Sequence, residues 1–186
     1  MNDGVGIWVD FDSDTWLYIP MALPEGYNSP KKWAWDKSVE IADKLGLDQE
    51  LTMKLCKYLE KLAETSNEFE HRFVLLKDID QPILNVTVMF DIWDTENNIS
   101  ALLSNEDDDE YLVPFFSKNL GTGLKALHLR TKKRIFRDDD IAYQFRYAFI
   151  TDVLEITAHA THQEREYLIK HEKEIDDLIM SVIQIA

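Results

Sequence analysis

Alternating apolar and polar positions are the clearest structural signal in this sequence, and the longest such run lies between residues 84 and 92. Apolar residues take every second position there: Leu84, Val86, Val88, Phe90 and Ile92. Successive side chains of a strand point to opposite faces, so these five share one face. The pattern predicts a long antiparallel strand with one dry face, whose five apolar side chains are among the most buried in the protein.

The clearest hairpin is predicted between residues 141 and 160. Aromatic side chains alternate along its first half: Tyr143, Phe145, Tyr147 and Phe149. Thr151 and Asp152 supply a turn, and the alternation resumes from residue 153 to residue 160. Shorter alternating or apolar runs predict further strands at 7–11, 16–19, 69–75, 111–116 and 124–131.

Helical spacing replaces alternation between residues 30 and 64. Ser29 followed by Pro30 has the form of a helix start, and Gly46 is suited to end that helix. Asp48 is suited to cap a second helix, in which leucines recur at helical spacing up to residue 62. Two helices joined this closely are expected to form a helical hairpin.

The C-terminal segment, 161–186, is predicted to be one helix. Thr161 and Glu164 have the spacing of a capping box. An apolar stripe follows: Ile175, Leu178, Ile179 and Val182. The order of the elements therefore predicts a single α+β domain over 1–186, with an antiparallel sheet of five to seven strands covered by a helical hairpin and a C-terminal helix.

The charge balance narrows the range of partners. The 186 residues include 35 acidic and 20 basic ones, giving a formal net charge of −15. Such a chain repels phosphate backbones and anionic membrane surfaces, so we expect no nucleic acid and no membrane as partner. A basic protein partner is favoured, although a well-solvated surface explains the same charge; the oligomeric state stays open.

Cysteine content and hydropathy indicate a cytoplasmic protein. Cys56 is the single cysteine, which excludes an intrachain disulfide and fits a reducing compartment. No apolar run approaches the ~20 residues of a membrane span, and the first residues lack the pattern of a signal peptide.

No stretch of the sequence has the spacing of a known catalytic or cofactor motif, so we expect no cofactor. The candidate metal ligands are His159, His162 and Glu164, which lie close together in the sequence. Imidazole and carboxylate groups are good zinc ligands, but this spacing is not that of a known zinc motif. Solvated histidines at a turn are the alternative.

Two features suggest contact with a protein partner. Asp107, Asp108 and Asp109 lie in an acidic run that could dock a basic protein, or could simply be a solvated loop. Trp33 and Trp35 are two residues apart and cannot share a helix face. If Trp35 faces the core, Trp33 lies near the surface, where it could anchor an interface or cover the edge of the sheet.

The C-terminal third carries a family resemblance. The segments Tyr147-Ala148-Phe149, Ala158-His159-Ala160 and Ile175-Asp176-Asp177-Leu178-Ile179, and the turn Leu23-Pro24-Glu25-Gly26-Tyr27, resemble the PsbP-like family, which includes the Ran-binding Mog-type proteins and uncharacterised actinobacterial members. The resemblance implies an antiparallel sheet with helices on both faces. Because members mostly bind other proteins, it also implies a role in protein binding.

These observations lead us to expect a non-enzymatic protein-interaction module. A small acidic inhibitor or immunity-type protein that binds a basic partner is one alternative. A metal-dependent enzyme that uses His159 and His162 is the other.

Overall fold

The computed structural model describes residues 5–66, 68–79, 83–93, 98–100, 102–103, 111–132 and 141–185. Its elements follow the chain in this order: β1 (Gly6–Val9), β2 (Trp16–Ile19), α1 (Pro30–Leu45), α2 (Gln49–Glu64), β3 (Glu70–Leu75), β4 (Asn85–Ile92), β5 (Tyr111–Ser117), β6 (Gly121–Lys132), β7 (Ile141–Ile150), β8 (Leu154–His162), α3 (Arg165–Lys170), α4 (Glu172–Met180) and β9 (Val182–Ile185).

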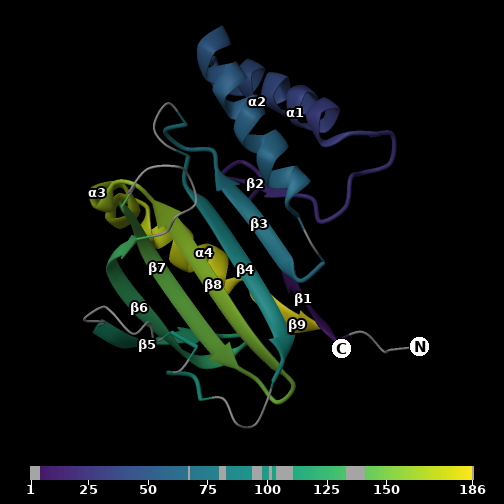
Figure 1. Ribbon diagram of the computed structural model, residues 1–186. Coiled ribbons are helices and arrows are strands. Elements are labelled where there is room, and N and C mark those ends of the chain that lie inside the picture. The colour runs from purple at the N-terminus through teal and green to yellow at the C-terminus, as the bar shows by residue number, and fades with distance from the viewer. Residues whose placement is uncertain are drawn as a thin grey trace.

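Seven of these strands form one antiparallel sheet, in the order β2-β3-β4-β8-β7-β6-β5. The strands from β5 to β8 pair in sequence order, and the pairing of β4 with β8 joins them to β2 and β3 (Figure 1). The predicted α+β class, with an antiparallel sheet of five to seven strands, is confirmed.

The residues predicted to cap the two helices of the hairpin are found at the helix ends. Ser29 Oγ accepts a hydrogen bond from the Lys32 N–H at 3.2 Å, and Asp48 Oδ1 accepts one from the Leu51 N–H at 2.8 Å. Gly46 follows α1 with a φ of 70°, a left-handed conformation that glycine adopts without strain. The local sequence therefore determines both ends of α1 and the start of α2.

The hairpin covers one face of the sheet at its β2–β3 edge. Trp33 of α1 and Leu59 of α2 belong to one buried cluster with Ile19 of β2 and Val74 of β3. Phe73, the neighbour of Val74, points to the other face and belongs to the cluster that includes the apolar side chains of α4. The helical hairpin and α4 therefore lie on opposite faces of the sheet (Figure 1).

The C-terminal segment is not the single helix that the sequence predicted. Pairing with Tyr143 of β7 extends β8 as far as His162, so α3 begins only at Arg165 and the predicted capping box is wrong. The chain bends at His171 between α3 and α4, and it continues beyond α4 as β9. The predicted apolar stripe is nevertheless buried: Ile175, Leu178, Ile179 and Val182 expose 0, 3, 1 and 1% of their surface.

The long strand β4 confirms most of the predicted dry face. Leu84, just before β4, and Val86 and Val88 within it are at most 1% exposed, and Phe90 packs partly buried against the same core. Ile92 is 78% exposed, so its predicted burial is wrong. The physical reason is that β4 extends beyond the first residue of β3, Glu70, which pairs with Met89.

A small second sheet joins the first and last described strands. β1 and β9 pair antiparallel, with Gly6 opposite Ile185. Ile7, Val9 and Val182 bury their side chains in the main core. Among the described helices, none combines the length and apolar character that a membrane span requires.

Candidate functional site

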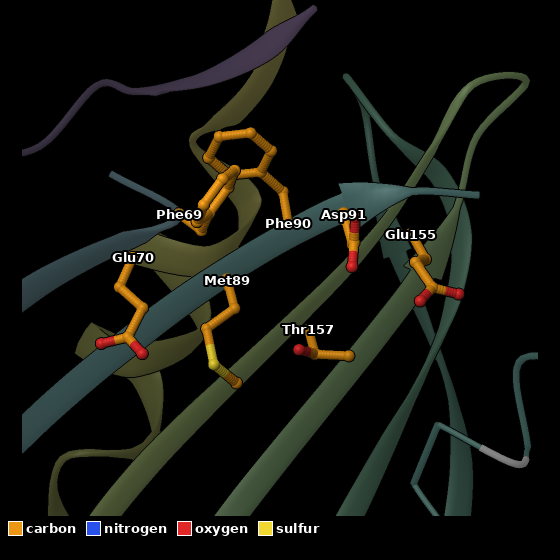
Figure 2. A pocket seen from close by; sticks show the side chains of 7 residues that line it. All are labelled: Phe69, Glu70, Met89, Phe90, Asp91, Glu155 and Thr157. Atoms are coloured by element: carbon orange, nitrogen blue, oxygen red, sulfur yellow. The ribbon is translucent and has the colours of Figure 1, made fainter. Parts of the chain in front are cut away.

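A hollow of about 330 Å³ lies where β3 begins, β4 ends and β8 begins (Figure 2). We call it the acidic hollow, because three of its side chains are carboxylates. Its lining consists of Phe69, Glu70, Met89, Phe90, Asp91, Glu155 and Thr157.

Two cross-strand pairs of β4 and β8 form the polar side of the hollow. Met89 lies opposite Thr157, and Asp91 lies opposite Glu155, in the antiparallel register. Directly opposite residues have Cβ atoms roughly 4.5–5.5 Å apart and share one face of the sheet. Two carboxylates therefore lie next to each other, with a thioether and a hydroxyl in the next row (Figure 2).

The two phenylalanines lie on the other side of β4 (Figure 2). The rings of Phe69 and Phe90 form an edge-to-face pair, with centroids 6.3 Å apart and an interplanar angle of 60°. Strand alternation explains the division, because Phe90 lies between Met89 and Asp91. The hollow thus has a polar side and an aromatic side.

Glu70 is held in place by Arg72. The Arg72 Nε–H donates a hydrogen bond of 2.9 Å to Glu70 Oε2, and the guanidinium also donates to the carbonyl of Leu62 at 3.0 Å and to Thr65 Oγ1 at 2.7 Å. This network ties the end of α2 to β3. The Glu70 carboxylate is therefore balanced inside the fold.

The lining is suited to recognition of a cation. Glu70, Asp91 and Glu155 carry its negative charge, and Met89 offers an apolar surface beside them.

The structure does not bring the candidate metal ligands together. β8 alternates its side chains, so His159 and His162 lie on opposite faces of the sheet. His162 Nδ1 accepts a hydrogen bond from the Glu164 N–H at 2.9 Å, and its ring stacks on Tyr167 with centroids 4.2 Å apart. Within the described ranges, no three His, Cys, Asp or Glu side chains lie where they could hold a metal ion.

The predicted exposure of Trp33 is wrong. Trp33 is 2% exposed and Trp35 is 52% exposed, the reverse of the expected arrangement. The reason is the packing of α1 against Ile19 and Val74, which turns the face that carries Trp33 toward the sheet. The other residues predicted to contact a partner, Asp107, Asp108 and Asp109, lie outside the described residues.

A buried lysine links the sheet to α4. The side chain of Lys125 on β6 is 5% exposed, and its Nζ lies 2.6 Å from Glu172 Oε1 and 2.7 Å from Asp176 Oδ1. The same Nζ lies 4.7 Å from the ring centroid of Phe145. The sequence analysis did not identify this cluster. Its one signal in the sequence is the spacing of Glu172 and Asp176, which places two carboxylates four residues apart on α4.

A buried histidine lies near the aromatic side of the hollow. The ring of His71 on β3 lies between Tyr18 and Phe90, with centroid distances of 5.9 and 6.2 Å, and is 8% exposed. Its Nδ1 lies 3.5 Å from the Tyr18 hydroxyl. Burial lowers the pKa of His71, because removal from water disfavours the charged imidazolium.

A second hollow, of about 620 Å³, lies beside the bend between α3 and α4. Its charged side chains form ion pairs with each other: Lys77 with Glu174 at 2.8 Å, and Lys170 with Asp78. The hydrogen bond from Lys170 lowers the pKa of Asp78. These ion pairs hold the bend between α3 and α4 against the segment that follows β3, so we assign them a structural role.

No protein-family model, no curated protein and no solved structure matches this chain. The resemblance to the PsbP-like family therefore stays a prediction.

Proposed function

We propose that this protein is a non-enzymatic protein-interaction module that binds a basic partner through the acidic hollow. The observation that carries the proposal is the cross-strand pair of Asp91 and Glu155 beside Met89 and Thr157. A site of this kind has the charge and the apolar contact area to hold a lysine or arginine side chain.

The charge of the hollow supports a cationic ligand. Three carboxylates line it, and a cation that binds there would form charge-assisted hydrogen bonds. The net charge of −15 adds long-range attraction for a basic partner, which raises the rate of association.

The two alternative functions relate differently to this proposal. An acidic inhibitor or immunity-type protein is a particular form of the same proposal, because it too would bind a basic protein. A metal-dependent enzyme that uses His159 and His162 has less support, since these side chains lie on opposite faces of β8.

The test is a binding titration with a fluorescent lysine-rich peptide at low salt. The variant Asp91→Asn/Glu155→Gln removes both carboxylates of the pair. The control Asp43→Asn/Glu64→Gln makes the same change in net charge at two exposed positions of α1 and α2. We expect the first variant to bind about tenfold more weakly, from the loss of charge-assisted hydrogen bonds, and the control to match the wild type.

Two results would contradict the proposal. One is the absence of peptide binding to the wild type. The other is an equal loss of affinity in both variants, which would assign the binding to overall charge and not to the acidic hollow.

A further inference from the structure

The helical hairpin carries apolar side chains that no described part of the protein covers. Trp35 and Val39 are four residues apart on α1, so they are neighbours on one helix face, and they expose 52% and 36% of their surface. Met53 on α2 is 46% exposed. The hairpin lies at the β2–β3 edge of the sheet, away from α3 and α4 (Figure 1). We call the exposed side of α1 and α2 around these three residues the hairpin face.

Both helices direct these side chains away from the core. Trp35 follows the buried Trp33 by two residues, and Met53 precedes the buried Leu55 by two. Two residues span about 200° of a helix turn, so Trp35 and Met53 point to the side opposite the core. The sequence analysis expected one tryptophan of α1 to lie near the surface and anchor an interface, and Trp35 is the exposed one.

The hairpin differs in charge from the rest of the chain. Residues 30–64 contain seven lysines, no arginine and seven acidic residues, so the hairpin is electrically neutral. The rest of the chain therefore carries the whole net charge of −15. Electrostatic repulsion between two copies of this protein is consequently weakest where two hairpins meet.

The middle parts of the two helices present opposite charges on the hairpin face. Between residues 36 and 43 of α1, the exposed charged side chains are Glu40 and Asp43, both acidic. Between residues 53 and 61 of α2, the exposed charged side chains are all lysines: Lys54, Lys57 and Lys61. Glu40 and Lys54 also form exposed ion pairs within their own helices, but such pairs contribute little and are readily exchanged. A face with one acidic and one basic helix complements a copy of itself in which the two helices change places.

We infer that a second copy of this chain docks on the hairpin face and forms a symmetric four-helix dimer. The helices of a hairpin are antiparallel, so a two-fold axis parallel to them places α1 of each copy antiparallel to α2 of the other. The apolar side chains at the centre then cover one another, and the acidic side chains of α1 meet the lysines of α2. This inference does not depend on the proposed function.

The short connection between the helices sets the register of the contact. Glu40 lies five residues before the end of α1, and Lys54 lies five residues after the start of α2. The two residues are therefore at the same level along the hairpin, and the two-fold axis keeps that level. Glu40 of one copy faces Lys54 of the other, beside the contact of Val39 with Met53.

Sedimentation equilibrium of the full chain over a range of concentrations tests the inference. We expect a dimer whose population rises with concentration. Trp35→Ala and Val39→Ser should each raise the dissociation constant about tenfold, because they remove the central apolar contact. The control Trp8→Ala removes a tryptophan of β1 that is 59% exposed and should leave the dissociation constant unchanged. Thermal unfolding checks that each variant is folded.

An exchange of charges tests the register. Glu40→Lys and Lys54→Glu should each weaken the dimer several-fold, because each places like charges opposite one another between the copies. The double variant should restore the wild-type dissociation constant. Glu40→Lys also makes the chain less acidic, so a weaker dimer in that variant cannot come from long-range repulsion.

Three results would overturn the inference. The first is a wild-type protein that stays monomeric at a concentration of about 1 mM. The second is a dimer that Trp35→Ala leaves intact. The third is a dimer that Trp8→Ala dissociates, which would assign the interface to the β1–β9 sheet.

Discussion

The hydroxyl of Tyr147 donates a 2.6 Å hydrogen bond to Asp176, which joins the middle of β7 to α4. Burial raises the pKa of Tyr147 well above its usual value, and the nearby negative charge of Asp176 adds to the effect. The phenol therefore stays protonated and remains a donor. The same carboxylate binds Lys125, so one acidic side chain of α4 holds two strands of the sheet.

The first prediction concerns Lys125. Lys125→Ala should cost about 1–3 kcal/mol of unfolding free energy, because the partly exposed Glu172 and Asp176 lose their charge-assisted hydrogen bonds to a buried cation. Urea denaturation measures the loss. Lys54→Ala removes an exposed pair with Glu50 and should leave the free energy of unfolding nearly unchanged. Equal effects of the two variants would show that the buried ion pair has no structural role.

The second prediction compares the two tryptophans of α1. Trp33→Ala should destabilise the protein by about 3–5 kcal/mol, because a fully buried ring leaves a cavity. Trp35→Ala should cost less than about 1 kcal/mol, since half of that side chain already lies in solvent. Thermal unfolding of both variants checks the assignment, and a reversed order would contradict the orientation of α1.

The third prediction concerns stability against pH. Because burial lowers the pKa of His71, the unfolded chain binds a proton at this residue more readily than the folded chain does. The contribution of His71 to stability is complete above the unfolded pKa of about 6.5 and falls as the pH drops below it. Urea titrations at about pH 8 and about pH 5 should show a smaller loss of stability for His71→Phe than for the wild type. Parallel losses in the two proteins would contradict this assignment.

The fourth prediction concerns the C-terminal segment. Deletion of residues 173–186 removes the four buried side chains of the apolar stripe, worth roughly 6–10 kcal/mol of transfer free energy. That rivals the net stability of a typical domain, so we expect a molten or insoluble product. Within the full chain, Leu178→Ala should cost about 2–5 kcal/mol, and Met180→Ala, at a position 38% exposed, less than about 1 kcal/mol. A truncated protein that melts cooperatively near the full-length temperature would contradict the prediction.

Local chemistry explains which parts of the fold could be predicted. Ser29, Gly46 and Asp48 mark helix ends through bonds to their own neighbours, so the sequence around them was sufficient. The face of α1 was not predictable in this way, because Trp33 and Trp35 lie on different faces and either of them could be the buried one. The contact with β2 and β3 decides which tryptophan is buried, and the local sequence of α1 does not contain that contact.

The candidate site could not be predicted from the sequence, because it depends on how the strands pair in the sheet. Alternation predicted the strands that hold Asp91 and Glu155, but not which strands pair or in which register. The exposure of Ile92 has a similar cause, because it follows from where β3 begins and not from any property of β4. Pairing and relative strand length are properties of the assembled sheet.

The pairing of β4 with β8 also determines at which stage of folding the acidic hollow can form. Strands β5 to β8 each pair with a strand next to them in the sequence, whereas the pairing of β4 with β8 brings together residues far apart in the sequence. Contacts between distant residues carry the largest entropy cost of loop closure and tend to form late. Since Asp91 comes from one half of the chain and Glu155 from the other, a partly folded chain cannot display the acidic hollow. A partner that binds there would bind only chains whose folding is complete.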